Sequence, residues 1–260
     1  MYIWTSFNKN NVMEQKQQFP TEQVTLPTKG LLYPKDSPLR KGSIEMKYMT
    51  AREEDILTNQ NYIENGTVLD KLLQSLIITP IDYNTLLAGD KNAILIAARI
   101  LGYGAEYEFE YRGEKITMDL STIKDKPLDE SLVTDGKNEF SFTLPTSKKE
   151  IVFKFLTHED EQKIQQEIKG LKKLKKESSN ELTTRMKHII LSVDGNSDTK
   201  VVRNFVDNEF LARDARELRK YIKKIQPDVD LTYSYEDRRG NITEIDIPVG
   251  IKFFWPDASV

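Results

Sequence analysis

The two histidines are the first side chains to consider for catalysis or metal binding, because the chain has no cysteine. His158 lies beside two acidic residues at the expected start of a helix, and His188 lies in the middle of a later one. Neither belongs to an HExxH-type pattern, and no thiolate could complete a zinc site. We interpret His158 as a capping or surface histidine and His188 as a structural one. The sequence therefore predicts no catalytic residue, no metal site and no cofactor.

A run of lysines is the second candidate for chemistry. Five lysines fall within the eight residues Lys169–Lys176, and clustered lysines can bind phosphates. However, Leu171 and Leu174 continue a helical apolar stripe through the run, and no aromatic residue is interleaved for base stacking. The whole chain has 38 basic and 41 acidic residues, a net charge of −3, which argues against general nucleic-acid affinity. We interpret the run as a solvated helix face.

Two shorter patterns resemble parts of known sites but lack their context. Gly102-Tyr-Gly104 looks like a fragment of a phosphate loop, yet it follows an expected helix instead of a strand. Glu106, Glu108 and Glu110 alternate along one face of an expected strand. Paired carboxylates can exchange protons, but alternating glutamates are ordinary on an exposed strand and protect a sheet edge.

The hydropathy pattern excludes a membrane span. The longest apolar run is Ala93–Ala98, which Arg99 ends, whereas a transmembrane helix needs about 20 apolar residues. The N-terminus lacks the basic and apolar regions of a signal peptide. We therefore expect a protein that is made and kept in a cytoplasm-like environment unless a larger assembly carries it out.

Large aromatic and apolar side chains near the ends of the chain are the more prominent feature. Such side chains anchor interfaces when they are exposed, although they could equally fold back onto the chain's own core. Because Pro248 and Pro256 bracket the C-terminal aromatic residues, we expect that segment to be extended, with one face inward and one face on a neighbour. The interface candidates are Trp4, Phe7, Leu31, Leu32, Tyr33, Phe253, Phe254 and Trp255.

The elements that would position these residues follow from periodicity. Thr50–Glu53 is a capping box, and apolar stripes at helical spacing indicate the helices. Arg112-Gly113 indicates a tight hairpin turn between alternating strands. Helices are expected to Leu57, over 68–77, from a cap at Asp90 to Leu101, and over 158–171, 182–193 and roughly 207–225. Strands are expected over 43–49, 106–111, 114–120, 139–144, 151–156, 230–235 and 242–247.

This order of elements predicts an α+β fold of helical segments combined with small antiparallel hairpins and sheets. Residues 1–24 are polar and aperiodic, so we expect an extended N-terminal arm. Residues 25–157 should form an α+β domain that ends in an antiparallel sheet. Residues 158–260 should form a helical segment with a C-terminal β-hairpin and an aromatic end.

Several segments together resemble the baseplate hub subunit family of contractile-tailed, T-even-like bacteriophages. The most specific phrase is Met-Thr-Ala-Arg-Glu-Glu-Asp-Ile-Leu at residues 49–57. The resemblance covers most of residues 26–120 and the C-terminal 30 residues, while the helical middle is not specific. The segments that carry it are Leu26–Pro34, Ile44–Leu57, Gly66–Leu73, Leu86–Leu95 and Ile247–Pro256.

The resemblance implies a role in virion assembly and no catalysis. Relatives in that family often carry Cys-x-x-Cys pairs at their hairpin turns, like small zinc ribbons. This chain has Tyr111-Arg-Gly-Glu114 and Glu236-Asp-Arg-Arg-Gly240 at the corresponding turns. We therefore expect degenerate, metal-free, zinc-ribbon-like hairpins that cross-strand pairs, hydrogen bonds and packing hold together.

The leading hypothesis is a non-catalytic structural subunit of a contractile-tail baseplate, near the hub. Its partners would be other baseplate and tail subunits, with no small-molecule substrate, and it would be assembled in the host cytoplasm and retained in the virion. The alternative is a transient assembly chaperone that is not retained in the virion. A third hypothesis is a nucleic-acid-binding module that uses the lysine run, although the composition argues against nucleic acid.

Overall fold

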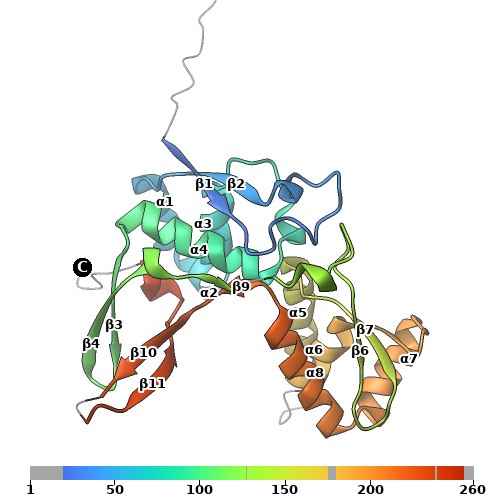
Figure 1. The fold of residues 1–260 in the computed structure, drawn as a ribbon. Helices are drawn as coiled ribbons and strands as arrows, with labels where there is room; N and C mark the ends of the chain where they lie inside the picture. The colour runs from blue at the N-terminus through green and yellow to red at the C-terminus, as the bar shows by residue number, and fades with distance from the viewer. Residues whose placement is uncertain (1–19, 127, 175–179, 238, 255–260) are drawn as a thin grey trace, which may run out of the picture.

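Helices and small antiparallel sheets alternate along the chain, which confirms the predicted α+β class. The computed structural model describes residues 20–126, 128–174, 180–237 and 239–254. Figure 1 shows two groups of elements. We name residues 20–136 with 227–254 the core lobe, and residues 137–226 the helical lobe.

The core lobe begins with an antiparallel pair, β1 (Thr21–Thr25) and β2 (Ser43–Lys47). The prediction that the arm reaches residue 24 is therefore wrong for residues 21–24, which pair with β2. Residues 21–24 show no alternating hydrophobicity, so their sequence did not indicate a strand. The partner strand β2 lies on the far side of a loop of 17 residues, 26–42. The helices of this lobe are α1 (Ala51–Leu57), α2 (Gln60–Glu64), α3 (Val68–Leu76) and α4 (Ala88–Tyr103).

Two β-hairpins extend from the core lobe side by side (Figure 1). Arg112 and Gly113 both have positive φ, 51° and 78°, which is the backbone of the predicted two-residue turn. Rings cross between the hairpins at Phe109–Tyr233 and Tyr111–Tyr235. The strands are β3 (Glu106–Tyr111) with β4 (Glu114–Asp119), and β10 (Thr232–Glu236) with β11 (Ile242–Asp246).

A short strand pair brings the end of the chain back to its first half. β5 (Asp125–Lys126) pairs with β9 (Asp228–Val229), and α4 lies against β9. Gly89 at the start of α4 makes this contact possible, because a Cβ there would lie 2.0 Å from the Pro227 carbonyl oxygen. Sequence pattern could not indicate this pairing, because a strand of two residues is too short to show a periodicity.

In its described residues the helical lobe contains one three-stranded antiparallel sheet and four α-helices. The predicted helix over 207–225 starts later, at Ala212, because buried Phe205 and Val206 form a π-helical turn before it. Val193, which fits a helical stripe, ends a strand instead. The elements are β6 (Phe140–Thr143), β7 (Glu150–Phe153), β8 (Ile190–Val193), α5 (His158–Leu174), α6 (Glu181–Ile189), α7 (Thr199–Asn204) and α8 (Ala212–Ile225).

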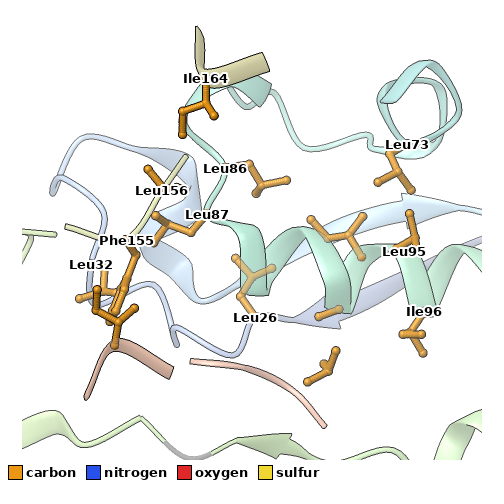
Figure 2. Close-up of a cluster of buried hydrophobic side chains, with 14 of the residues drawn as sticks. Leu26, Leu32, Leu73, Leu86, Leu87, Leu95, Ile96, Phe155, Leu156 and Ile164 are labelled. Atoms are coloured by element: carbon orange, nitrogen blue, oxygen red, sulfur yellow. The ribbon is translucent and has the colours of Figure 1, made fainter. Parts of the chain in front are cut away.

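One continuous hydrophobic core joins the two lobes. The start of α4 and the segment before α5 are linked by backbone hydrogen bonds, from Ala88 to Leu156 and from His158 to Leu86. The predicted domain boundary at residue 157 is therefore wrong, because β7 pairs with β8 and β5 with β9 across it. Figure 2 shows the joint, with Leu26, Leu32, Leu86, Leu87, Phe155, Leu156 and Ile164 among its side chains.

Candidate functional site

A partly buried cluster of titratable side chains at the joint between the lobes has the composition of a catalytic site. Asp70 of α3 accepts hydrogen bonds from Tyr83 (3.0 Å) and Lys91 of α4 (2.5 Å). The Lys91 ammonium lies 3.4 Å from Nδ1 of His158, and Gln162 lies 2.9 Å from Nε2 of that imidazole. The ring of Tyr83 packs edge-on against the imidazole. His158 is buried, so its interpretation as a surface histidine is wrong.

The electrostatics of this cluster favour a fixed network over proton transfer. Burial and the Lys91 ammonium lower the pKa of His158, so the imidazole is neutral at neutral pH. Burial and the Asp70 carboxylate raise the pKa of Tyr83, so its hydroxyl keeps its proton. The grooves described below are lined by other residues. The cluster therefore ties α3, α4 and α5 together without facing any of these grooves.

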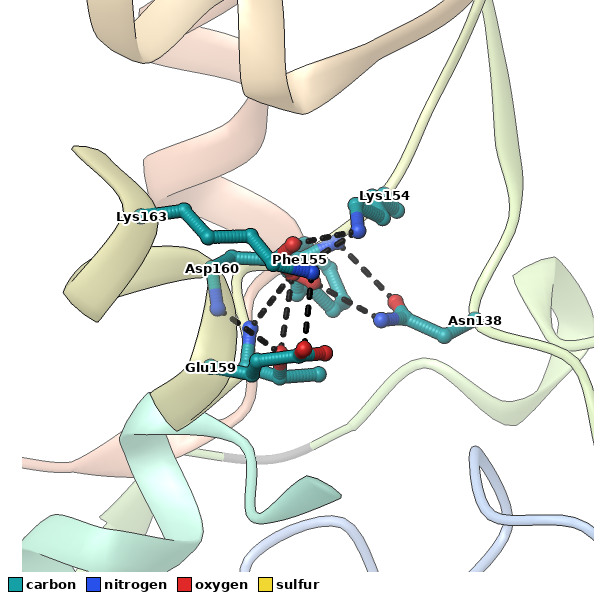
Figure 3. Close-up of polar contacts among 7 residues, drawn as sticks. Asn138, Lys154, Phe155, Glu159, Asp160 and Lys163 are labelled. Atoms are coloured by element: carbon teal, nitrogen blue, oxygen red, sulfur yellow. Dashed lines mark hydrogen bonds and ion pairs between the residues drawn. The ribbon is translucent and has the colours of Figure 1, made fainter. Parts of the chain in front are cut away.

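The first turn of α5 is held by a second polar set, which Figure 3 shows. Asp160 accepts from the Thr157 amide and hydroxyl (3.1 and 2.9 Å) and from Lys154 (2.8 Å). Burial acts to raise the pKa of Asp160, but these hydrogen bonds outweigh it and lower the pKa. The Asn138 amide bonds both backbone groups of Phe155. Each contact positions the backbone at the joint.

Asp90 is a fully buried carboxylate in the first turn of α4. It accepts hydrogen bonds from the Thr28 amide (3.0 Å), the Thr28 hydroxyl (2.7 Å) and the Tyr33 hydroxyl (2.6 Å). The prediction that Asp90 caps the helix is wrong, because Leu87 is the N-cap residue. Burial raises the pKa of Asp90 to about 6, although these hydrogen bonds act in the opposite direction. Asp90 thus ties the loop after β1 to α4.

Arg99 is the other buried charge of α4, and it bonds only carbonyl oxygens among the described contacts. Its guanidinium donates to the carbonyls of Phe253 (2.8 Å), Gly104 (2.7 Å) and Glu106 (3.0 Å). The ring of Tyr107 lies within 5.9 Å of the guanidinium. Arg99 therefore secures the C-terminal segment and the end of α4 at once.

His188 also lies in an ion cluster, on the surface of the helical lobe. Arg203 of α7 makes two bonds to Glu167 of α5 (3.0 and 3.1 Å), and His188 Nε2 lies 3.0 Å from the same carboxylate. These partners, with Arg203 first, outweigh partial burial and lower the pKa of Glu167 to about 2. The structural interpretation of His188 agrees with this contact, which links three helices.

Most of the interface candidates that the structure describes are buried within the chain. Leu32 and Tyr33 belong to the hydrophobic core and Leu31 is half-buried. Phe253 and Phe254 are fully buried, and Ile251–Phe254 is a 3₁₀-helix. The prediction of an extended segment with one outward face is therefore wrong for these two rings. Their side chains complete the core beneath Arg99, which sequence pattern alone could not indicate. Trp4, Phe7 and Trp255 lie outside the described residues.

The tips of the two β-hairpins contact each other. The Tyr235 hydroxyl donates to Glu114 across the two hairpins (2.7 Å), beside the Tyr111–Tyr235 ring contact at 5.1 Å. Across the described ranges, no group of three or more histidine, cysteine, aspartate or glutamate side chains could hold a metal ion. A ring contact and a hydrogen bond therefore join the two tips.

Grooves open on both lobes. One of 610 Å³ runs beside β3 and the segment Pro248–Lys252. Another of 540 Å³ lies over α5, α6 and α7, where most of its charged side chains are already ion-paired. A third of 310 Å³, the α6–α8 groove, lies between those helices. It is lined by Lys126, Leu182, Arg185, Met186, Ile189, Arg219, Ile222, Lys223, Gln226 and Asp228.

The sequence analysis did not predict the buried hydrogen bonds of Asp90 and Arg99, although one signal for them was present. Asp90 and Arg99 interrupt an otherwise apolar helix, and a charge within an apolar stripe indicates a buried partner. The identity of the partners could not be inferred, because Thr28 lies 62 residues away and Phe253 154 residues away. The lysine run behaves as expected where it is described, with Lys169, Lys172 and Lys173 exposed on α5.

Within the described residues, no helix is long and apolar enough to cross a membrane. Comparisons with known protein families, with curated proteins and with solved structures find no match to this chain.

Proposed function

We propose that the chain is a non-catalytic structural subunit of a contractile-tail phage baseplate, close to the hub. It would act through protein–protein contacts, bind no cofactor, and be retained in the virion after assembly in the host cytoplasm. Its partners would be neighbouring baseplate and tail subunits.

One observation carries the proposal: the segments that resemble the baseplate hub family meet around α4. Leu26–Pro34 and Leu86–Leu95 are joined by the bonds of Thr28 and Tyr33 to Asp90. The C-terminal segment is joined to the same helix by the bond from Arg99 to Phe253. The segments that carry the resemblance therefore maintain a rigid body and not a reactive centre. A structural subunit needs such a rigid body.

The polar clusters support the same proposal. Asp70, Lys91 and His158 could exchange protons by chemical type, but their contacts are with one another and with Tyr83 and Gln162. A catalytic base must reach the proton that it removes from a substrate. A network whose polar atoms bond within the chain instead stabilises the junction of three helices.

Mass spectrometry of purified virions tests the proposal. In virions of the phage that encodes the chain, its peptides should copurify with known baseplate proteins at a constant ratio through a density gradient. A phage that lacks the gene should accumulate defective baseplates, and the gene supplied in trans should restore them.

Two other outcomes are distinguishable. If the chain is abundant in infected cells and absent from virions, while its loss still blocks baseplates, it is the assembly chaperone. If the phage without the gene builds normal, infectious tails, neither assembly role is correct.

A further inference from the structure

We propose that the α6–α8 groove binds an acidic amphipathic helix of a partner protein. This inference goes beyond the proposed function and holds whether or not the partner belongs to a baseplate.

The floor of the groove is an apolar stripe that the chain leaves partly uncovered. Leu182, Met186 and Ile189 follow one another at i, i+4 and i+7 along α6, and Ile222 faces them from α8. Met186, Ile189 and Ile222 are buried, but Leu182 is 48% exposed. The stripe therefore continues past the point where the chain's own packing ends. Exposed apolar surface with a polar border is typical of a protein-binding site.

The border of the groove is cationic. Lys126, Arg185, Arg219 and Lys223 line it, against the single acidic residue Asp228. Asp228 is already engaged by the side chain of Asn92 (2.9 Å), and Arg185 is engaged by Glu161.

Arg219 is the cation of the border that has an unsatisfied hydrogen-bond donor. Its Nη1 atom is buried and has no hydrogen-bond partner among the described residues. A buried donor without an acceptor is costly, and a charged donor more so. Because the chain itself covers Nη1, a carboxylate in the groove bonds this atom only when the Arg219 side chain turns outward, and the resulting charge-assisted hydrogen bond removes that cost. Lys223, one turn further along α8, would face a second carboxylate on the same helix.

The shape and chemistry of the groove select the kind of occupant. A groove between two helices receives the apolar face of a third, whose anchors recur at i, i+3, i+4 and i+7. The volume of 310 Å³ is at the low end for small-molecule pockets, about 300–1,000 Å³, and suits a few anchoring side chains. The lining contains no aromatic ring on which a nucleic-acid base could stack.

The chain's own N-terminal residues have the wrong charge to fill the groove. Residues 1–19 contain two lysines and one glutamate, so they would bring net positive charge to a cationic border. Charge complementarity therefore favours a partner whose helix carries glutamates or aspartates on both sides of its apolar face.

Fluorescence anisotropy with designed peptides tests the proposal on the full chain. The probes are fluorescein-labelled helical peptides with Leu, Ile, Met or Phe at i, i+3, i+4 and i+7 and with flanks of glutamate. The comparison peptides have the same apolar positions and flanks of lysine. We expect saturable binding of the acidic peptides that weakens as salt rises, and no binding of the basic ones.

Matched variants locate the binding. Leu182→Ser and Arg219→Gln should each weaken the acidic peptide at least about tenfold, through lost apolar burial and a lost charged hydrogen bond. Leu211→Ser and Arg213→Gln are the controls, since Leu211 is 47% exposed and Arg213 is exposed on α8 outside the groove. They should leave the affinity unchanged. Lys223→Glu tests the charge of the border at an exposed position, and it should also weaken binding of the acidic peptide.

Three results would overturn the proposal. One is that no acidic peptide binds at concentrations up to about 1 mM. Another is equal binding of acidic and basic peptides. The third is an equal loss of affinity in the groove variants and in the two controls.

Discussion

Asp90 in the core lobe and Asp214 in the helical lobe are both fully buried carboxylates with contrasting environments. Asp90 accepts two hydroxyls and one amide, and burial raises its pKa to about 6. Asp214 accepts the backbone amides of Thr146 and Ser147 at 2.8 and 2.9 Å. Burial acts to raise the pKa of Asp214 as well, but there the hydrogen bonds prevail and lower it.

The two carboxylates differ in protonation and not in the kind of contact that they make. Both join segments far apart in sequence, since Asp90 bonds Thr28, 62 residues away, and Asp214 bonds Thr146, 68 residues away. In the core lobe the pKa of Asp90 is raised, whereas in the helical lobe the pKa values of Asp214 and of the surface carboxylate Glu167 are both lowered. Buried carboxylates thus fix tertiary contacts in both lobes, with the charged form disfavoured at Asp90 and favoured at Asp214.

The largest difference in stability between the two lobes should come from alanine substitutions at two helical glycines. Gly89→Ala would place Cβ 2.0 Å from the Pro227 carbonyl oxygen, and backbone on both sides cannot move away by rotating a side chain. We expect a loss of about 4 kcal/mol or more in the free energy of unfolding. Urea denaturation followed by circular dichroism measures it.

Gly170→Ala in α5 is the control, because no heavy atom of the described residues outside the backbone of its own helix lies within 4 Å of the added Cβ. Alanine in a helix interior should raise stability by about 0.5–1 kcal/mol. Equal effects at the two glycines would mean that the contact between α4 and β9 does not constrain the fold.

Two arginines give the next comparison. Arg99→Met should cost about 3 kcal/mol in the free energy of unfolding, because the carbonyls of Gly104, Glu106 and Phe253 lose their buried donor. Hydrogen exchange should also accelerate at the amides of the C-terminal segment. Arg203→Met removes a surface ion pair and should cost about 0.5–1 kcal/mol.

If Arg99→Met is as mild as Arg203→Met, then packing of Phe253 and Phe254 holds the C-terminal segment without the guanidinium. The comparison uses the same substitution at both sites, so the lost helix propensity is matched.

The two aspartates should give pH dependences of opposite sign. Asp90 has a raised pKa, so its contribution to stability is complete below the ordinary value of 3.8 and is lost as pH rises through about 6. Relative to Asp90→Asn, the wild-type chain should lose up to about 3 kcal/mol between about pH 4 and about pH 7.

Asp214 has a lowered pKa, so its contribution is complete above 3.8 and is lost as pH falls below that value. The advantage of the wild-type chain over Asp214→Asn should therefore shrink in acid. Chemical denaturation at a series of pH values measures both differences. Parallel curves for the two variants would contradict the contrast between the two sites.

The smallest effect is expected at the hairpin tips. The hydrogen bond that joins them is less buried than those of Asp90 and Arg99. Tyr235→Phe removes the hydrogen bond to Glu114 and keeps the ring contact with Tyr111. It should cost about 1 kcal/mol, and Tyr235→Ala should cost more. If Tyr235→Phe melts at the wild-type temperature, ring packing alone joins the two hairpins.

Local structure could be predicted from the sequence because local residues determine it. The Thr50–Glu53 capping box is present, with Glu53 accepting the Thr50 amide and hydroxyl. The turn at Arg112-Gly113 and the apolar faces of α3 and α8 also agree with the pattern. Each depends on residues within a few positions of one another.

Tertiary neighbours could not be predicted by the same reasoning. Tyr33 and Phe253 are large side chains near prolines, and that pattern fits an exposed anchor as well as a core residue. Their environment is set by Asp90 and Arg99, which lie on a helix between them in sequence. The α6–α8 groove likewise depends on how two separately predicted helices pack.

The return of residues 227–254 to the core lobe has a consequence for synthesis on the ribosome. Arg99 emerges early, but its acceptor at Phe253 lies 154 residues further along the chain. Until residues 227–229 are made, β5 has no partner strand and Gly89 has no backbone against it. A nascent chain therefore keeps this part of the core open until residues 227–254 have left the ribosome. A product that stopped before residue 227 would display Arg99 and apolar surface to cellular proteases. The core lobe therefore closes only after the helical lobe has been synthesised.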